Sequence, residues 1–504
     1  MNVSEENTEL QHLRSRVDDK ALANSSSGRF LLHIGNEAEG AFIDSDGLGA
    51  PVGDFVVNQA RHSGLKSEFL VHTVERVLDR VACQTGSDSS SNGALPFVGE
   101  YFEASIARRA EVNQHLQGVD ASMLDIGLLP LNQEEINRTV ANISGTSPRY
   151  TNIYTKLGAK HQGAFSLKIP GSNRKVSVPQ SPLLGGCTCQ RSPNVQYHPN
   201  HIGLAYDVTL ALAAFGAVFS NSPFIAGGTG QYGNRPWAWQ QDMHRSLLGS
   251  DRDGFSLGYV ETRDASALPI WIERLLEGPA LLTFEDVKKD RCEMEPYPNL
   301  QLRKGSAWLQ SASFSWSNVN SKLCVWVEIR FPDAQPTELD GLALDLALIG
   351  ATTFFVKGSN GGLFPPVDSA DELASHADAK QNYNTVLRWG IENSLGRPTE
   401  ITWRGKTLTV ERWVLEHIIP NAIEGLSLLG ISRGFSERLL GLLVRQVKER
   451  KTGSYWGLRE LDRVMKQQHL PEGEAIPKVL VTLAQHQQDQ STSLDDIRGV
   501  ADFE

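Results

Sequence analysis

The stretch VWVEIRFPDAQPT at residues 325–337 restricts the fold more than any other part of the sequence. Apolar and polar residues alternate over 325–331, which predicts a β-strand that ends before a proline. Glu328 and Arg330 share one face of this strand with Trp326, because successive side chains point to opposite faces. An acid and an arginine two residues apart on a strand are most often exposed to solvent and form an ordinary ion pair across strands. The alternative is a sheet floor on which Glu328 holds a divalent metal and Arg330 a phosphate.

A second strand is predicted near the N-terminus, where residues 30–44 read FLLHIGNEAEGAFID. The period of two places Glu37 and Glu39 on the same face. On an edge strand these acids would face water. On a central strand they would repel each other unless a cation lay between them.

Two further acids, Glu68 and Glu75, are seven residues apart in a segment rich in apolar residues. This spacing returns to the same face of a helix but not of a strand. Helical geometry would therefore bring both carboxylates to one side. A stripe of acids facing solvent is the alternative, although the apolar neighbours leave little room for it.

Residues 166–198 have the pattern of a hairpin-like pair of strands. The second strand, residues 189–196, has an entirely polar even-numbered face that could line a cavity or face water; it consists of Gln190, Ser192, Asn194 and Gln196. A glycine-rich loop follows at 227–236 and contains Arg235. It is not a phosphate-binding P-loop, because it lacks the Gly-Lys-Ser/Thr ending.

Composition narrows the class of protein further. The chain has 504 residues, of which 40% are hydrophobic, so it can bury a large core. Its formal net charge of -11 argues against a nucleic-acid groove. Five irregularly spaced cysteines argue against a disulfide framework and for a reducing compartment, so a cytoplasmic location is expected. The apolar run at 202–219 contains an aspartate and predicts a buried helix, with no membrane partner.

The sequence shows no internal repeat and no clear linker, which favours one large mixed-sheet domain. Amphipathic spacing predicts a long helix at 96–117. The C-terminal third is predicted to be helical and to cover the core, with helices at 339–350, 371–393, 410–430, 435–450 and 458–468.

Four groups of residues, in their order along the chain, resemble the glutamate–cysteine ligase and carboxylate–amine ligase family. The similarity extends from about residue 30 to about residue 465, and single motifs are degenerate whereas their order and spacing are more specific. It rests on GNEAE at 35–39, Glu68 with Glu75, NSPF at 221–224 with the loop to Arg235, and Glu328-Ile329-Arg330 followed by Asp333.

The resemblance implies an α+β fold: a large, mostly antiparallel, funnel-like sheet with covering helices, as in the catalytic domain of glutamine synthetase. The polar ends of the chain predict a division into three parts. Residues 1–27 would form a flexible N-terminal arm, 28–470 the ligase catalytic domain, and 471–504 a C-terminal tail that is partly mobile.

The activity implied by the resemblance is ATP- and Mg²⁺-dependent formation of a γ-glutamyl amide bond through an acyl phosphate, as in glutathione biosynthesis. The partners would be a small carboxylate, glutamate, and an amine such as cysteine or another amino acid. By resemblance, the metal ligands are Glu37, Glu39, Glu68, Glu75 and Glu328. The catalytic pair is Arg330 and Glu328; Arg330, Gln190 and Asn194 bind the nucleotide, and Arg235, Asn221 and Arg149 bind substrate.

One departure from the family keeps other functions open. Many relatives carry histidines on the strand that here reads from Gln190 to Gln196, and one of these histidines helps to bind metal or nucleotide. The amide oxygens present in this chain are weaker ligands for that metal ion. A catalytically inactive member that binds a small molecule or a partner protein is therefore the alternative function. A phosphotransferase of the same superfold, such as a guanidino kinase, is a third. The oligomeric state is not indicated by the sequence.

Overall fold

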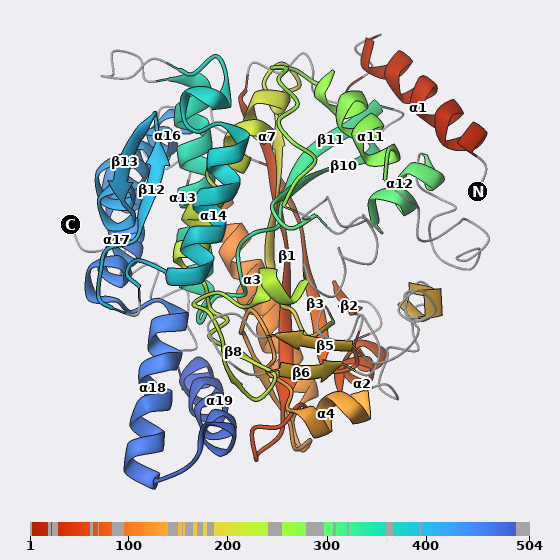
Figure 1. The fold of residues 1–504 in the computed structure, drawn as a ribbon. Helices are drawn as coiled ribbons and strands as arrows, with labels where there is room; N and C mark the ends of the chain where they lie inside the picture. Colours follow the sequence, from red (N-terminus) through yellow and green to blue (C-terminus); the bar gives the residue numbers. More distant parts are fainter. Residues whose placement is uncertain are drawn as a thin grey trace.

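A seven-stranded antiparallel sheet forms the centre of the computed structural model (Figure 1). Its strand order is β10-β11-β7-β1-β3-β2, and β4 pairs with β1 off this path. The strands are β1 (Leu31–Ile43), β2 (Leu65–Ser67), β3 (Thr73–Ala82), β4 (Ser122–Leu124), β7 (Arg191–Tyr197), β10 (Ala312–Val319) and β11 (Lys322–Ile329).

The structure describes residues 3–18, 22, 29–60, 64–68, 70–82, 95–139, 150–153, 155–156, 165–168, 175–178, 186–239, 255–278, 297–305, 309–319, 322–358, 366–393 and 395–489.

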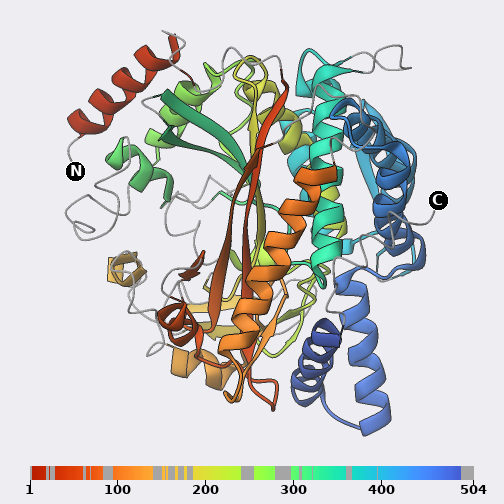
Figure 2. The same cartoon turned by 180° about the vertical axis from the view of Figure 1, so that it is seen from behind.

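Helices cover one face of the sheet. Seen from behind in Figure 2, α3 lies along β1 and β3, with α13 beside it. The N-terminal and middle helices are α1 (Val3–Asp18), α2 (Gly53–Gln59), α3 (Leu95–His115), α4 (Gln133–Thr139), α7 (Ile202–Ala211), α8 (Ala213–Val218), α9 (Arg235–Trp239), α11 (Ala267–Leu276) and α12 (Pro298–Gly305). The later ones are α13 (Glu338–Lys357), η4 (Ala370–Glu372), α14 (His376–Trp389), α15 (Val410–Arg412), η5 (Trp413–Ile418), α16 (Ile419–Leu428), α17 (Arg433–Glu449), α18 (Gly453–Gln468) and α19 (Glu472–Asp489).

The hydrophobic core lies between the sheet and these helices. Ile34, Val195 and Val327 are paired across β1, β7 and β11, and all three are fully buried in the largest core cluster. Helix α13 is long and apolar enough to cross a membrane by length and composition, but 89% of its most apolar window is buried in the protein. It therefore has the environment of a core helix.

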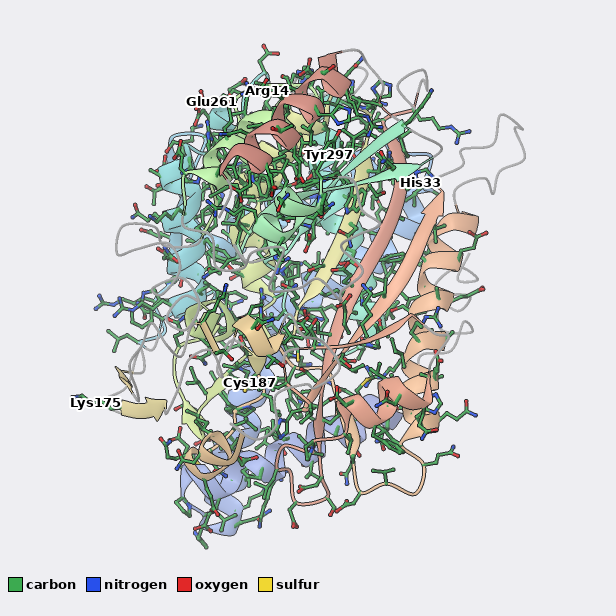
Figure 3. All side chains as sticks on the ribbon, turned by 90° about the vertical axis from the view of Figure 1, so that its right-hand side faces the viewer. Arg14, His33, Lys175, Cys187, Glu261 and Tyr297 are labelled. Carbon is green, nitrogen blue, oxygen red and sulfur yellow. The ribbon has the colours of Figure 1, made fainter. Side chains whose placement is uncertain are left out.

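Three small hairpins lie outside the main sheet: β5 (Phe165–Lys168) with β6 (Lys175–Val178), β8 (Phe224–Ile225) with β9 (Gly228–Thr229), and β12 (Glu400–Trp403) with β13 (Lys406–Thr409). In Figure 3, Lys175 marks the β5–β6 hairpin on the left and His33 marks β1, while α3 lies to the right. The hairpin and α3 are thus on opposite sides of the sheet. The β12–β13 hairpin was not predicted from the sequence.

The predicted strands at 30–44 and 325–331 are confirmed, and β1 is central because β7 and β3 flank it. Two other predictions, one of a helix and one of a strand pairing, were wrong. The segment with Glu68 and Glu75 is not helical: it forms the β2–β3 hairpin, in which Lys66 faces Glu75. The strand that begins after Gln190 does not pair with the 165–168 strand, because it inserts between β1 and β11 as β7.

Helices lie near both ends of the chain. Most of the predicted N-terminal arm forms α1, in which Leu10, Leu13 and Val17 are spaced along one face and are buried in the core cluster. The C-terminal segment contains the 18-residue helix α19, which packs against α18. Residues 19–21, 23–28 and 490–504 lie outside the described residues.

Candidate active site

Four of the five predicted acids lie on one polar face of the central sheet. Directly paired residues of antiparallel strands share a face. Glu39 of β1 is paired with Glu75 of β3, and Glu328 of β11 is paired with Asn194 of β7. Ser192 connects the two pairs, because it faces Glu37 and lies two residues from Asn194 on β7. The shared-face prediction is therefore correct for four of the five acids, and they come from three strands.

This polar face is the one turned away from α3 and α13. Arg76, the neighbour of Glu75, points to the opposite face, where its Nη1 donates to Glu338 Oε1 of α13 at 2.6 Å. Glu338 also accepts a hydrogen bond from Ser105 of α3. Since Arg76 and Glu75 alternate along β3, the acids face the side on which the β5–β6 hairpin lies (Figure 3).

Burial and mutual repulsion raise the pKa values of three of these acids. Burial and the charges of Glu75 and Glu328 raise the pKa of Glu37 from 4.5 to about 7. The pKa of Glu75 is also raised to about 7, through burial and through Glu68, although Lys66 opposes the rise. Burial and Glu68 raise the pKa of Glu39 well above its usual range. Neighbouring carboxylates in a desolvated site favour a proton or a cation between them.

Glu68 and Glu75 come together through the hairpin. The charge of Glu68 helps to raise the pKa of Glu75, and Lys66 Nζ donates to Glu75 Oε1 at 3.1 Å. Tyr150 donates its hydroxyl to Glu68 Oε2 at 3.3 Å. Its predicted substrate-binding neighbour, Arg149, lies outside the described residues.

Glu328 differs from the other acids because it is paired with cations. Its Oε2 accepts from Lys304 Nζ at 2.8 Å, and Arg330 forms an ion pair with Oε1. Burial opposes ionisation, but Lys304 and Arg330 outweigh it and hold the pKa of Glu328 far below its usual range. Ser313 and Ser315 of β10 complete its surroundings with hydroxyl donors.

Arg330 lies directly after β11 at the edge of the acid group, with 15% of its side chain exposed. Burial lowers the pKa of its guanidinium, but the charges of Glu328 and Glu39 raise it by more. It remains positively charged next to several carboxylates. It is thus placed where an anionic ligand of the polar face would need a cation.

Gln190 and Asn194, the predicted nucleotide-binding residues, both lie on the polar face. The backbone N–H of Gln190 donates to Glu39 Oε2 at 2.8 Å, so this residue orients a carboxylate. Asn194 Oδ1 accepts from the indole N–H of Trp326 at 3.1 Å. Their role toward a nucleotide stays a prediction.

Arg235 and Asn221 meet at Asp333, to which the sequence analysis assigned no role although the resemblance includes it. Arg235 Nε donates to Asp333 Oδ1 at 2.6 Å, and its Nη2 donates to the carbonyls of Arg330 and Phe331 at 3.0 and 2.8 Å. The Asn221 backbone N–H donates to Asp333 Oδ2 at 2.8 Å. Each is at most 3% exposed. Substrate binding by Arg235 and Asn221 stays a prediction, whereas the geometry favours a role in holding the segment after β11.

The residues partly fit a Mg²⁺ site. Carboxylate oxygens are the ligands that Mg²⁺ prefers, and a cation would relieve the repulsion between Glu37, Glu39 and Glu75. Glu328 does not fit, because cations and hydroxyls already surround it. Within the described part of the chain, no three acidic, histidine or cysteine side chains are arranged closely enough to hold a metal ion. Metal binding by the five predicted acids therefore stays a prediction.

Sequence reasoning missed Lys304 and the serines of β10. The serines could have been found, because SASFS at 311–315 alternates and places Ser313 and Ser315 on one face. No local pattern links Lys304 to Glu328, since the lysine belongs to a short helix 24 residues earlier in the chain.

No protein-family model matches the sequence, and no curated protein is detectably similar to it. The structure, however, is similar to a bifunctional glutathione synthetase from Pasteurella multocida, with a TM-score of 0.50 and 10% identity. The two proteins share a fold. The match covers 92% of this chain and 53% of the synthetase, so the chain spans about half the length of that protein. The predicted α+β class, with an antiparallel sheet and covering helices, is confirmed.

Two other ligases give weaker matches. A glutamate–cysteine ligase from Francisella tularensis in complex with AMP has a TM-score of 0.47 and 13% identity over 94% of this chain and 92% of that one. The Pup ligase PafA in complex with Pup has a TM-score of 0.40 and 11% identity over 95% and 80%. Both TM-scores are below 0.5, so the fold assignment rests on the synthetase.

Proposed function

We propose that this chain is an ATP- and Mg²⁺-dependent carboxylate–amine ligase that joins the γ-carboxylate of glutamate to an amine. The observation that carries the proposal is the group of carboxylates on the polar face, of which Glu39 is buried and Glu37 and Glu75 are partly buried, with Arg330 at its edge. A structural role alone gives no reason to place three carboxylates side by side with little access to water, because desolvating like charges is costly. The ligase fold supports the same function.

The polar face has groups suited to phosphoryl transfer. Glu37, Glu39 and Glu75 would hold Mg²⁺, which when bound neutralises phosphate charge and orients the triphosphate. Arg330 would contact the transferring phosphoryl group, since its planar fork suits phosphate oxygens. Catalysis of this kind depends mainly on positioning and charge stabilisation, which a rigid sheet floor supplies.

The reaction proposed has two steps. An oxygen of the substrate carboxylate attacks the γ-phosphorus, the bond to the bridging oxygen breaks, and ADP leaves. The amine nitrogen then attacks the acyl carbon and loses a proton, and inorganic phosphate departs with the bond electrons. We propose cysteine or another amino acid as the source of the amine.

A single screen tests the function. Purified protein is incubated with ATP, Mg²⁺ and glutamate, with each amino acid or simple amine in turn, while ADP release and product mass are measured. A ligase gives ADP, phosphate and one amide product, and both signals fall in the Glu37→Gln variant. ADP without phosphate or amide would identify a phosphotransferase instead.

An inactive binding protein is the second candidate, and the pairing of Glu328 with Lys304 favours it, because one predicted metal ligand is already neutralised. ADP release that stays at background with every acceptor, together with saturable binding of ATP or of an amino acid, would support this candidate over the ligase.

A further inference from the structure

The carboxylate of Glu328 has no room for another ligand on one of its oxygens. Its Oε2 accepts from Lys304 Nζ at 2.8 Å, Ser315 Oγ at 3.0 Å and Ser313 Oγ at 3.1 Å. A carboxylate oxygen offers about two lone pairs, so these three donors already occupy it. The other oxygen, Oε1, is bound by Arg330. A metal ion at Glu328 would have to displace Lys304, the serines or Arg330.

The position of Lys304 is fixed by the helix that carries it. Lys304 is the penultimate residue of α12, and the Nη2 of the preceding Arg303 donates to the carbonyls of Leu276, at 2.9 Å, and Gly278. At the start of α12, Glu9 of α1 accepts from the Leu300 N–H at 3.0 Å. Figure 1 shows α1 and α12 together beside β10 and β11. Contacts at both ends of α12 therefore direct the lysine toward the sheet.

The cations near the other acids are placed differently. Glu37 accepts no hydrogen bond from any residue that the structure describes, so its oxygens are available to a ligand. Lys66 contacts Glu75, but 53% of its side chain is exposed, against 17% for Lys304. A solvated lysine can leave its partner at little cost, whereas removing the partner of a buried ion pair is strongly unfavourable.

We propose that the Lys304 ammonium is a built-in cation that takes the place of a divalent ion at Glu328. This inference rests on the proposed function and makes it more specific. Glu328 is then not a metal ligand, and metal binding is confined to the side of the polar face formed by Glu37, Glu39 and Glu75. Lys304 is a positioning residue, because it keeps Glu328 ionised beside Arg330 and thereby orients the guanidinium.

The number of metal ions bound per chain tests this proposal. Bound Mn²⁺ is counted by electron paramagnetic resonance with a non-hydrolysable ATP analogue present. We expect Lys304→Met to bind one more Mn²⁺ than the wild type, because Glu328 becomes free to ligate. The double variant with Glu328→Gln should return to the wild-type number. Lys304→Arg retains the positive charge, and Lys66→Met removes the other lysine on the same face as a matched control. Neither variant should change the number of Mn²⁺ ions bound per chain.

Glu328→Gln alone provides an independent measurement if Lys304→Met folds poorly, which circular dichroism would reveal. This variant should bind the same number of Mn²⁺ ions per chain as the wild type. Loss of one Mn²⁺ in this variant, or an unchanged number in a folded Lys304→Met variant, would overturn the proposal. A wild type that binds no Mn²⁺ would count against the proposed ligase, but the difference between wild type and Lys304→Met would still decide the role of Lys304.

Discussion

Replacing Glu37 by glutamine should stabilise the protein at high pH and have almost no effect at low pH. The pKa of Glu37 is raised from 4.5 to about 7 in the folded chain by burial and by neighbouring acids. The folded state therefore binds more protons than the unfolded state between these values, so its stability falls as pH rises through this window. Glutamine keeps the shape of the side chain without the charge.

The size of the effect follows from the shift in pKa. Each pKa unit corresponds to about 1.4 kcal/mol, so the rise from 4.5 to about 7 sets a limit of about 3 kcal/mol above pH 7. Urea unfolding at pH 4.5 and pH 8, followed by tryptophan fluorescence, measures the free energy of unfolding at both ends of the window. Glu416→Gln is the control, because it removes a carboxylate that is 55% exposed.

Mg²⁺ adds a second measurement to the same experiment. A ligand that binds only the folded state stabilises it by mass action, so Mg²⁺ should stabilise the wild type at pH 8 more than Glu37→Gln. If Glu37→Gln changed the free energy of unfolding by the same amount at pH 8 as at pH 4.5, the argument that Glu37 lies in a repulsive, desolvated site would be refuted.

Three other changes give distinct outcomes. Arg330→Lys should lower kcat about a hundred- to a thousandfold, with little change in stability and no rescue by extra Mg²⁺, because the planar fork is lost; steady-state kinetics at several Mg²⁺ concentrations would detect a rescue. Arg235→Ala should cost about 3–5 kcal/mol of unfolding free energy, since it leaves Asp333 buried and unpaired; a change of under 1 kcal/mol would return Arg235 to a substrate-binding role. Leu13→Asp should detach α1, because Leu13 is fully buried, and limited proteolysis should then cleave the N-terminal helix rapidly.

The features that local patterns determine were predictable from the sequence. Alternation placed Glu37 with Glu39 on one face of β1, and it placed Arg330, directly after β11, on the side of Glu328. The long apolar periodicity predicted α3 and α13. These predictions succeed because the alternation of a strand and the repeat of a helix involve residues that are only a few positions apart in the sequence.

The features that the sequence did not reveal depend on contacts between distant parts of the chain. The spacing of Glu68 and Glu75 suits a helix, but pairing with β1 selects a hairpin. Arg235 has the residue type of a carboxylate clamp, and only the fold shows that Asp333 already holds it. Lys304 reaches Glu328 because α1 and α12 pack together, which no period in the sequence encodes.

The strand β1 carries polar side chains on both faces, with Glu37 on one and Asn36 on the other, where Asn36 Nδ2 donates to Tyr101 at 2.7 Å. The face with Glu37 and Glu39 offers little apolar surface at the centre of the strand to drive early collapse. Glu37 and Glu328 are also roughly 290 residues apart, so a very long loop must close before they become neighbours. Non-local pairing of this kind is slow. We therefore expect the polar face to be the last part of the protein to assemble during folding, after the helices behind the sheet have formed the core.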